Sequence, residues 1–166
     1  MKLRQHLIIG GIAAITLYFY RDWALWKMTL FFVSSVLIDA DHYWDYLWRN
    51  KFADWSGWRM FRYCNLLEEH GNEKNFYAFS LLHTAEIFLL IYILARFCNY
   101  NFFMTVFLGM AFHLFLDIIS FAYKRRLFIR AYSIIEYWVR RPRLIRRGVD
   151  SDAFCRKMFK ESKKPA

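Results

Sequence analysis

The amino-acid sequence predicts an all-α fold, namely a four-helix transmembrane bundle with an interfacial inner loop and a basic amphipathic C-terminal helix. Of its 166 residues, 58% are hydrophobic and 22% are aromatic, which is well above the usual share in a soluble domain. The apolar residues gather in runs that are apolar on every side, as helices in lipid are. Most Lys and Arg residues lie at one end of these runs.

The predicted spans cover about residues 7–20, 23–38, 76–97 and 102–123. The last two are long enough to cross a bilayer, whereas the first two are short against the roughly 20 residues that a span needs. A signal peptide is the alternative for the first run, because Lys2 and Arg4 precede it. The sequence Tyr18–Asp22 offers no small-residue cleavage site, so a retained span is favoured.

The net charge of +10 is explained by topology rather than by nucleic-acid binding. Of the 24 Lys and Arg residues, 21 precede the first run, separate the second from the third, or follow the fourth. The positive-inside rule therefore places both termini in the cytoplasm. The aromatic and charged segment 49–75 is expected to lie on the membrane surface. Residues 124–141 are expected to form an interfacial helix that ends at Pro142 and binds anionic inner-leaflet lipids.

The predicted domain organisation is an integral membrane domain over residues 1–147 and a mobile basic tail over residues 148–166. Cys64, Cys98 and Cys155 show no CxxC spacing, so a thiolate zinc site is not indicated.

Four short polar clusters interrupt or border the apolar runs, and all four fall in the predicted cytoplasmic half of the bundle. They are His6, Asp39–His42, His83–Glu86 and His113–Asp117. An ionisable residue within a bilayer costs about 3 kcal/mol and usually marks a functional site or a mutually satisfying cluster. The common depth of these imidazoles and carboxylates predicts a metal site.

Helical spacing supports this prediction. His113 and Asp117 are four residues apart and share a face, with Gly109 one turn earlier. His6 is followed on its own stripe by Gly10 and Ala14. Small residues beside polar ones let neighbouring helices approach closely.

In the clusters Asp39–His42 and His83–Glu86, the two outer residues are three positions apart. His83 and Glu86 share a helical face, as do Asp39 and His42, whereas Asp41 points off that face unless the helix unwinds there. Asp39 or Asp41 could alternatively flank or cap a helix end.

The predicted ligands are histidines and aspartates: His6, Asp39, Asp41, His42, His83, His113 and Asp117. Such a set suits one or two divalent ions, with zinc favoured and manganese or iron as alternatives. Glu86 and Asp41 are the candidate catalytic residues, Glu86 as a base, as an extra ligand or as a carboxylate that orients His83. His70 lies in a charged turn, is expected to be solvated, and is a further candidate ligand.

At these residues the sequence resembles the membrane-bound metal-dependent hydrolase-like family of small bacterial inner-membrane proteins. The resemblance rests on His6, on Leu37–His42, on Leu82–Thr84, and on the Gly-x-x-x-His-x-x-x-Asp pattern from Gly109 to Asp117. The last spacing is also similar to that of zinc-dependent phospholipase C-like enzymes. The family pattern has proline where this chain has Ile38, and a second mid-chain histidine where this chain has only His83.

The resemblance implies a multi-pass protein of the bacterial inner membrane with a hydrolase activity. A bound metal can activate water and polarise a phosphoryl oxygen, so we expect a phosphoester, or a lipid phosphoester, as the substrate at the cytoplasmic face. One alternative is a non-catalytic membrane protein in which a metal or polar cluster staples the helices. A proton or ion path is the other, although the outer halves of the spans carry only Thr16, Lys27, Thr29 and Thr105 as polar residues.

Overall fold

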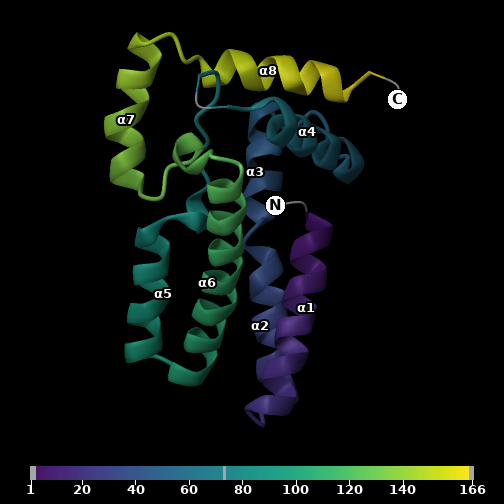
Figure 1. Cartoon of the computed structure of the whole chain (residues 1–166), viewed down its shortest axis with the longest axis vertical. Coiled ribbons are helices and arrows are strands. Elements are labelled where there is room, and N and C mark those ends of the chain that lie inside the picture. Colours follow the sequence, from purple (N-terminus) through teal and green to yellow (C-terminus); the bar gives the residue numbers. More distant parts are fainter. Residues whose placement is uncertain (1–2, 73, 165–166) are drawn as a thin grey trace. The chain divides into compact units, whose positions relative to one another are not determined.

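The computed structural model describes residues 3–72 and 74–164 and is all-helical in that part of the chain, which contains no β-strand. The elements are α1 (Leu3–Tyr20), α2 (Leu25–Leu37), α3 (Ala40–Arg49), α4 (Gly57–His70), η1 (Leu81–His83), α5 (Ala85–Phe97), α6 (Tyr100–Tyr123), η2 (Leu127–Ile129), α7 (Ile134–Arg146) and α8 (Ser151–Ser162) (Figure 1). The predicted all-helical class is therefore confirmed.

The chain divides into two compact units that interleave in sequence. Unit 1 contains Met1–Asp39 and Leu82–Arg125, and unit 2 contains Ala40–Leu81 and Arg126–Ala166. This division differs from the predicted one, in which residues 1–147 form one domain. Each unit has its own packing and is described separately.

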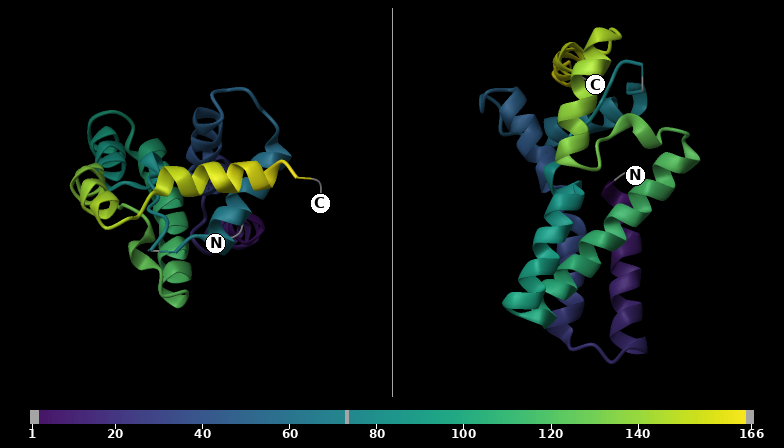
Figure 2. Two further views of the ribbon diagram at one scale, coloured as in Figure 1. Left: turned by 90° about the horizontal axis from the view of Figure 1, so that it is seen from above. Right: turned by 90° about the vertical axis from the view of Figure 1, so that its left-hand side faces the viewer.

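Unit 1 is built from two helical hairpins, α1 with α2 and α5 with α6 (Figures 1 and 2). The main contact between the hairpins joins α2 to α6. At this contact a Cβ on Gly109 would lie 2.5 Å from the Phe31 carbonyl oxygen and 2.1 Å from Ser34 Oγ. On α1, a Cβ on Gly10 would lie 3.0 Å from Ser35 Oγ. The predicted close approach at these small residues is confirmed.

The lengths of the helices support only part of the four-span prediction. Within the described residues, α6 alone is long and apolar enough to cross a membrane, and the apolar part of α1, Gln5–Tyr20, is shorter. Helices α2 and α5 have 13 residues each. The all-helical bundle is shown, whereas four complete crossings are not.

The third predicted span begins too early. Helix α5 starts at Ala85 rather than near residue 76. The preceding backbone is used elsewhere, because the Ala78 amide donates to the Ile129 carbonyl over 2.7 Å and the Ala78 carbonyl accepts from the Ala131 amide over 3.0 Å. A chain segment that pairs in this way cannot also make the hydrogen bonds of a helix.

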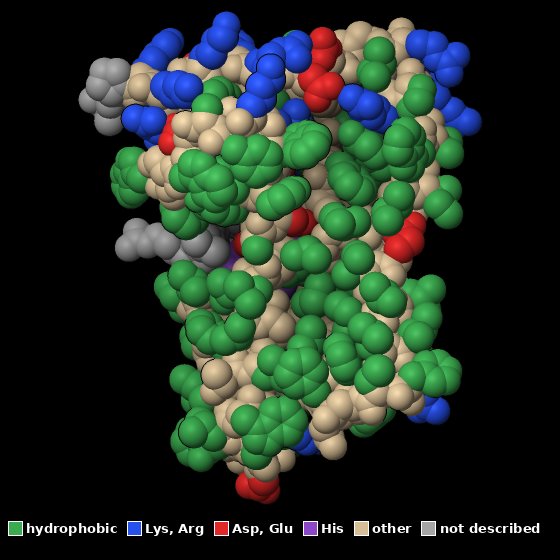
Figure 3. All heavy atoms as spheres, turned by 180° about the vertical axis from the view of Figure 1, so that it is seen from behind, with side chains coloured by type: hydrophobic (Ala, Val, Ile, Leu, Met, Phe, Trp, Pro, Cys, Tyr) green, Lys and Arg blue, Asp and Glu red, His purple; other side chains and the backbone are tan. Residues whose placement is uncertain are grey.

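The outer surface of unit 1 is apolar. Large hydrophobic side chains on all four helices are exposed, including Ile12, Phe19, Leu89 and Phe115, each at more than half of its maximum. Figure 3 shows hydrophobic side chains covering the helices of this unit on the face in view. A soluble monomer rarely exposes contiguous apolar area of this kind.

Unit 2 has a conventional core. Tyr46 and Leu47 of α3, Tyr63 of α4 and Met158 of α8 are buried against one another. Helix α8 begins where the Asp150 side chain accepts a hydrogen bond from the Ala153 amide over 2.8 Å. The sequence predicts a mobile tail from residue 148, but α8 places Cys155, Met158 and Ser162 in buried positions.

The predicted interfacial helix over residues 124–141 also differs from the structure. A short 3-10 turn, η2, precedes α7, whose start is fixed by the Ser133 side chain accepting from the amides of Ile135 and Glu136. Pro142 lies inside α7 instead of ending it. Proline lacks an amide hydrogen and so costs a helix one hydrogen bond, but here it does not stop the helix.

Candidate metal centre

Five ionisable side chains of unit 1 converge from different elements. His6 comes from the first turns of α1, Asp39 follows the end of α2, His83 ends η1, and His113 and Asp117 lie one turn apart on α6. Because α1, α2 and α6 pack together through small residues, these side chains reach a common point. The metal cluster, as we call these five residues, contains five of the seven predicted ligands.

The nitrogen and oxygen atoms of the metal cluster lie at short and similar separations. The Nε2 atom of His6 is 3.1 Å from Asp117 Oδ1. The Nε2 atom of His113 is 3.4 Å from Asp39 Oδ1 and 3.8 Å from Asp117 Oδ2. The corresponding distances for His83 Nε2 are 3.7 Å to Asp39 and 3.9 Å to Asp117. His83 and His113 therefore direct Nε2 towards both carboxylates, and His6 directs Nε2 towards Asp117.

The separations of 3.1 and 3.4 Å match those of donors that share one ion, and the other three, at 3.7–3.9 Å, are longer. Donors bound to one metal ion at about 2.1 Å lie roughly 3.0–3.4 Å apart in octahedral or tetrahedral geometry. Good N–H···O hydrogen bonds span about 2.7–3.2 Å, and the 3.1 Å contact of His6 with Asp117 also falls within that range. His6, His113 and Asp117 by themselves form a group of buried donors that could hold a metal ion.

The orientation of His113 is fixed from outside the metal cluster. Its Nδ1 atom lies 2.7 Å from the Ser35 carbonyl oxygen, so the proton of a neutral ring sits on Nδ1 and is donated to Ser35. The Nε2 atom then carries the lone pair and faces Asp39, as a metal ligand requires. The His113 ring also stacks on His6, with 3.9 Å between ring centroids and 13° between planes.

Burial makes the charge balance of this group important. The side chains of His83 and His113 are 0% exposed and that of Asp117 is 4% exposed, whereas Asp39 is 20% exposed. A buried carboxylate with a second, partly buried one beside it is costly unless opposite charge accompanies them. A divalent cation would neutralise both while the three imidazoles remain neutral, so the donor set fits such an ion.

The structure differs from the prediction that Asp39 and His42, and likewise His83 and Glu86, share one helical face. Helix α2 ends at Leu37 and α3 begins at Ala40, so Asp39 and His42 do not share a helical face. The helix ends here although residue 38 is isoleucine and not proline, and the Ile38 side chain is almost fully buried.

The second pair is separated in the same way. His83 ends η1 and Glu86 lies in the first turn of α5, beyond the N-cap residue Thr84. Glu86 is half-buried, one turn beyond His83. Its role as a base or extra ligand stays a prediction.

Asp41 and His42 belong to α3 of unit 2, so their predicted roles also stay predictions. Within that unit, His42 Nδ1 is 3.8 Å from Asp41 Oδ1. The Arg130 guanidinium lies 3.4 Å from His42 Nε2. His70 is exposed at the end of α4, with Nδ1 3.2 Å from the Leu66 carbonyl oxygen.

Sequence reasoning did not identify Ser35 as a partner of the metal cluster. The contribution comes from its backbone carbonyl, which has no signature in the sequence. The one available signal was the pair Ser34 and Ser35 inside an otherwise apolar run, where small polar residues mark a close helix contact. Both hydroxyls bond backbone carbonyls three residues earlier, at 3.1 and 2.8 Å.

Comparison of this chain with protein-family models, with curated proteins and with solved structures finds no match.

Proposed function

We propose that the chain is a membrane-bound, metal-dependent hydrolase that cleaves phosphoesters at the cytoplasmic face of the bacterial inner membrane. The observation that carries this proposal is the convergence of three imidazole nitrogens and two carboxylates, at separations of 3.1–3.9 Å, in unit 1. The resemblance in the residues around His6, His83, His113 and Asp117 supports the same activity class.

The metal cluster has the ligands for such chemistry. His6, His83, His113, Asp39 and Asp117 would hold a divalent ion, with zinc favoured by the imidazole majority and manganese or iron as alternatives. When bound, the ion would lower the pKa of water and polarise a phosphoryl oxygen.

The remaining roles fall to residues of this chain. Ser35 holds His113 in the ligating tautomer through the 2.7 Å contact to Nδ1. Asp39 is the most exposed member of the metal cluster and marks the side from which a substrate would enter. Glu86 would accept the proton of the attacking water.

Membrane embedding is supported by the composition and by the surface of unit 1. Helix α6 is long and apolar enough to cross a bilayer. Exposed apolar side chains also cover α1, α2 and α5. Helices α2 and α5, with 13 residues each, are too short to cross a bilayer by themselves. A helix pair shorter than the bilayer can be accommodated by local thinning.

A metal staple is the second candidate, and burial is the observation that favours it. Three of the five side chains are at most 1% exposed. A structural site closes all coordination positions, whereas a catalytic site keeps one open.

The first experiment measures bound metal by elemental analysis in protein purified in mild detergent. Wild type is compared with His113→Ala and Asp117→Ala. The matched control is Thr105→Ala, because Thr105 is buried on the same stripe of α6 and its hydroxyl donates to the Asn101 carbonyl of its own helix. We expect near-stoichiometric metal in wild type and in the control, and loss of metal in the other two variants.

Hydrolysis of an aryl phosphodiester and of a dispersed phospholipid is then measured for the metal-loaded protein and for Glu86→Gln. Turnover that falls in Glu86→Gln while bound metal is retained supports catalysis. Bound metal without turnover supports the staple. A well-folded wild type that holds no metal after incubation with zinc or manganese contradicts both proposals.

A further inference from the structure

An exposed group of aromatic rings lies at the end of α3 in unit 2. Phe52 is the centre of this aromatic cluster, with ring centroids 5.8 Å from Trp44, 6.4 Å from Trp48 and 6.0 Å from Trp55. The three indoles are 60–67% exposed, and Phe52 is 38% exposed. These rings contact one another without forming part of the buried core of the unit.

The backbone turn that builds the aromatic cluster is strained. Lys51 and Phe52 both have positive φ angles, +56° and +59°. Such angles are uncommon for residues other than glycine, and for bulky residues they persist only where the surroundings enforce them. Here the Phe52 amide donates to the Leu47 carbonyl over 2.9 Å, and Trp55 Nε1 donates to the Phe52 carbonyl over 3.0 Å. The chain thus maintains an unfavourable conformation that displays aromatic rings to the outside.

The charged residues around the aromatic cluster do not cover it. Arg49 bonds Asp45 and Asp152, and Arg59 bonds Asp54. Lys51 is exposed beside Phe52. A group of indole rings bordered by cations matches the composition of segments at the membrane interface, where the apolar ring and the N–H group are both accommodated.

We propose that the aromatic cluster inserts into the headgroup region of a phospholipid bilayer and anchors unit 2 to it. Charge complementarity favours an anionic lipid surface, since unit 2 contains 17 of the 24 Lys and Arg residues and 10 of the 14 Asp and Glu residues. Connectivity also favours a lipid surface, because Trp44 lies only five residues after Asp39, the residue at which the first segment of unit 1 ends. A bilayer that holds unit 1 is therefore within reach of the aromatic cluster, so the inference rests on the membrane part of the proposed function.

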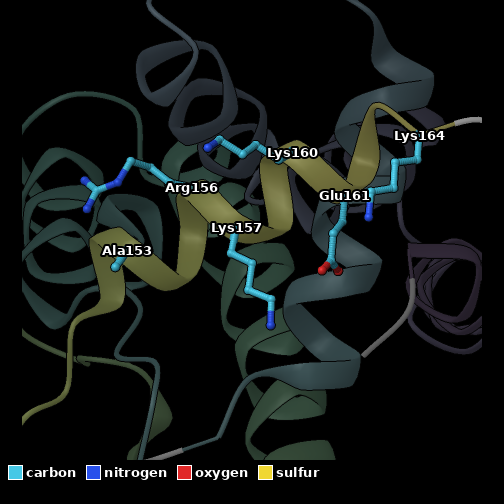
Figure 4. Close-up of a pocket in the computed structure, with 6 residues that line it drawn as sticks. All are labelled: Ala153, Arg156, Lys157, Lys160, Glu161 and Lys164. Carbon is cyan, nitrogen blue, oxygen red and sulfur yellow. The ribbon is translucent and has the colours of Figure 1, made fainter.

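Helix α8 provides an internal contrast on the same unit. Arg156, Lys157, Lys160 and Lys164 surround a shallow hollow together with Ala153 and Glu161, and this lining contains no aromatic residue (Figure 4). Cations without aromatic rings can attract headgroups electrostatically, but they do not enter the apolar boundary. Lys160 is exposed and serves as the reference position for water accessibility.

The test uses the full-length chain in lipid nanodiscs of phosphatidylcholine and phosphatidylglycerol. A nitroxide spin label is attached in turn to Trp48→Cys, Ile12→Cys and Lys160→Cys, in a Cys98→Ser background whose residual labelling is subtracted. Trp44→Cys is a second position in the aromatic cluster. Electron paramagnetic resonance then compares collisions of each label with dissolved oxygen, which partitions into lipid, and with a water-soluble nickel complex.

We expect the ratio of oxygen to nickel accessibility to be several-fold higher at Trp48 and Trp44 than at Lys160. A ratio at both positions equal to that of Lys160 overturns the inference, as does low accessibility to both probes, which would indicate a protein contact. The Ile12 label separates the two proposals, since Ile12 is exposed on α1 of unit 1. A lipid-exposed Ile12 with a water-exposed Trp48 overturns the anchor alone, whereas water exposure at Ile12 contradicts the embedding of unit 1.

Discussion

Units 1 and 2 distribute polar and apolar residues in opposite ways. Unit 1 buries His6, His83, His113 and Asp117 and exposes leucines, isoleucines and phenylalanines. Unit 2 buries Tyr46, Leu47, Tyr63 and Met158, and ties its surface together with ion pairs such as Arg49 with Asp152 and Arg141 with Asp152.

The difference indicates what each unit depends on for its stability. In unit 1 the carboxylates of the metal cluster need a compensating charge, and an exposed apolar surface of this kind marks a contact with lipid or with another protein. In unit 2 burial of apolar area supplies the stabilisation directly. We therefore expect the proposed metal and the proposed lipid environment to matter for unit 1 and little for unit 2, and the following predictions test that contrast.

Removal of the proposed metal should have the largest effect, and this effect should be confined to unit 1. At a metal concentration about 1,000 times the dissociation constant, binding stabilises the folded state by about 4 kcal/mol. Treatment with a chelator should increase amide hydrogen exchange in α1 and α6 and leave α4 and α8 unchanged. Equal loss of protection in both units would contradict the contrast.

Truncation of Met158 should destabilise unit 2 without affecting metal content. Met158 is 2% exposed and packs in the core with Tyr46 and Tyr63. Met158→Ala should cost about 3 kcal/mol of unfolding free energy, measured by denaturant titration in detergent. The control is Lys157→Ala at the exposed neighbouring position. Equal stability of Met158→Ala and Lys157→Ala would mean that α8 does not contribute to the core.

A methyl group at Gly109 should destabilise unit 1. Its Cβ would lie 2.5 Å from the Phe31 carbonyl oxygen, so α2 and α6 must move apart at a cost of about 2 kcal/mol. Gly57→Ala is the matched control, because a Cβ at Gly57 has no neighbour within 4 Å. We expect a lower thermal midpoint and weaker metal binding in Gly109→Ala only. Unchanged values in that variant would mean that the helix contact is not tight.

Acidification should produce a smaller effect, located in unit 2. A hydrogen bond from Arg59 holds the pKa of Asp54 below its usual range. Burial raises the pKa of Asp152, but Arg49 and Arg141 outweigh this and leave it lowered. A lowered pKa in the folded state adds stability above the unfolded-state value, about 3.9 for aspartate, and this contribution is lost as the pH falls through the folded-state pKa.

The measurement is unfolding of wild type and of Asp54→Asn between pH 7 and pH 2.5. The stability of wild type should decrease below about pH 4, and the decrease should be shallower in Asp54→Asn. Parallel pH profiles would show that the ion pair of Asp54 with Arg59 does not contribute.

Sequence periodicity correctly predicted α6 and the helical face that His113 and Asp117 share. His113 and Asp117 are four residues apart within one uninterrupted apolar run, and helical geometry alone then places them together. The same reasoning predicted the close contacts at Gly10 and Gly109, which the structure confirms. In these cases the relevant spacing is local.

The same reasoning was less successful in predicting where helices begin and end. It continued the third span back to residue 76, paired Asp39 with His42 on one helix, and ended a helix at Pro142. The first two errors concern a boundary that is set by hydrogen bonds to distant residues, as at Ala78, or a helix end that the local residues do not indicate, as at Ile38. The third is the opposite case, because α7 continues through Pro142.

The sequence by itself determined the helical class, the apolar character of the surface, and the identities of the histidines and aspartates available for a metal. Only the tertiary structure showed that Asp39 reaches this group from beyond the end of α2 and His83 from a 3-10 turn. It alone also showed that Ser35 orients His113 and that α8 belongs to a core. The physical reason is the distance along the chain over which each kind of interaction acts. Periodicity reports which residues share a face over a few turns, whereas a ligand set drawn from separate helices depends on how those helices pack.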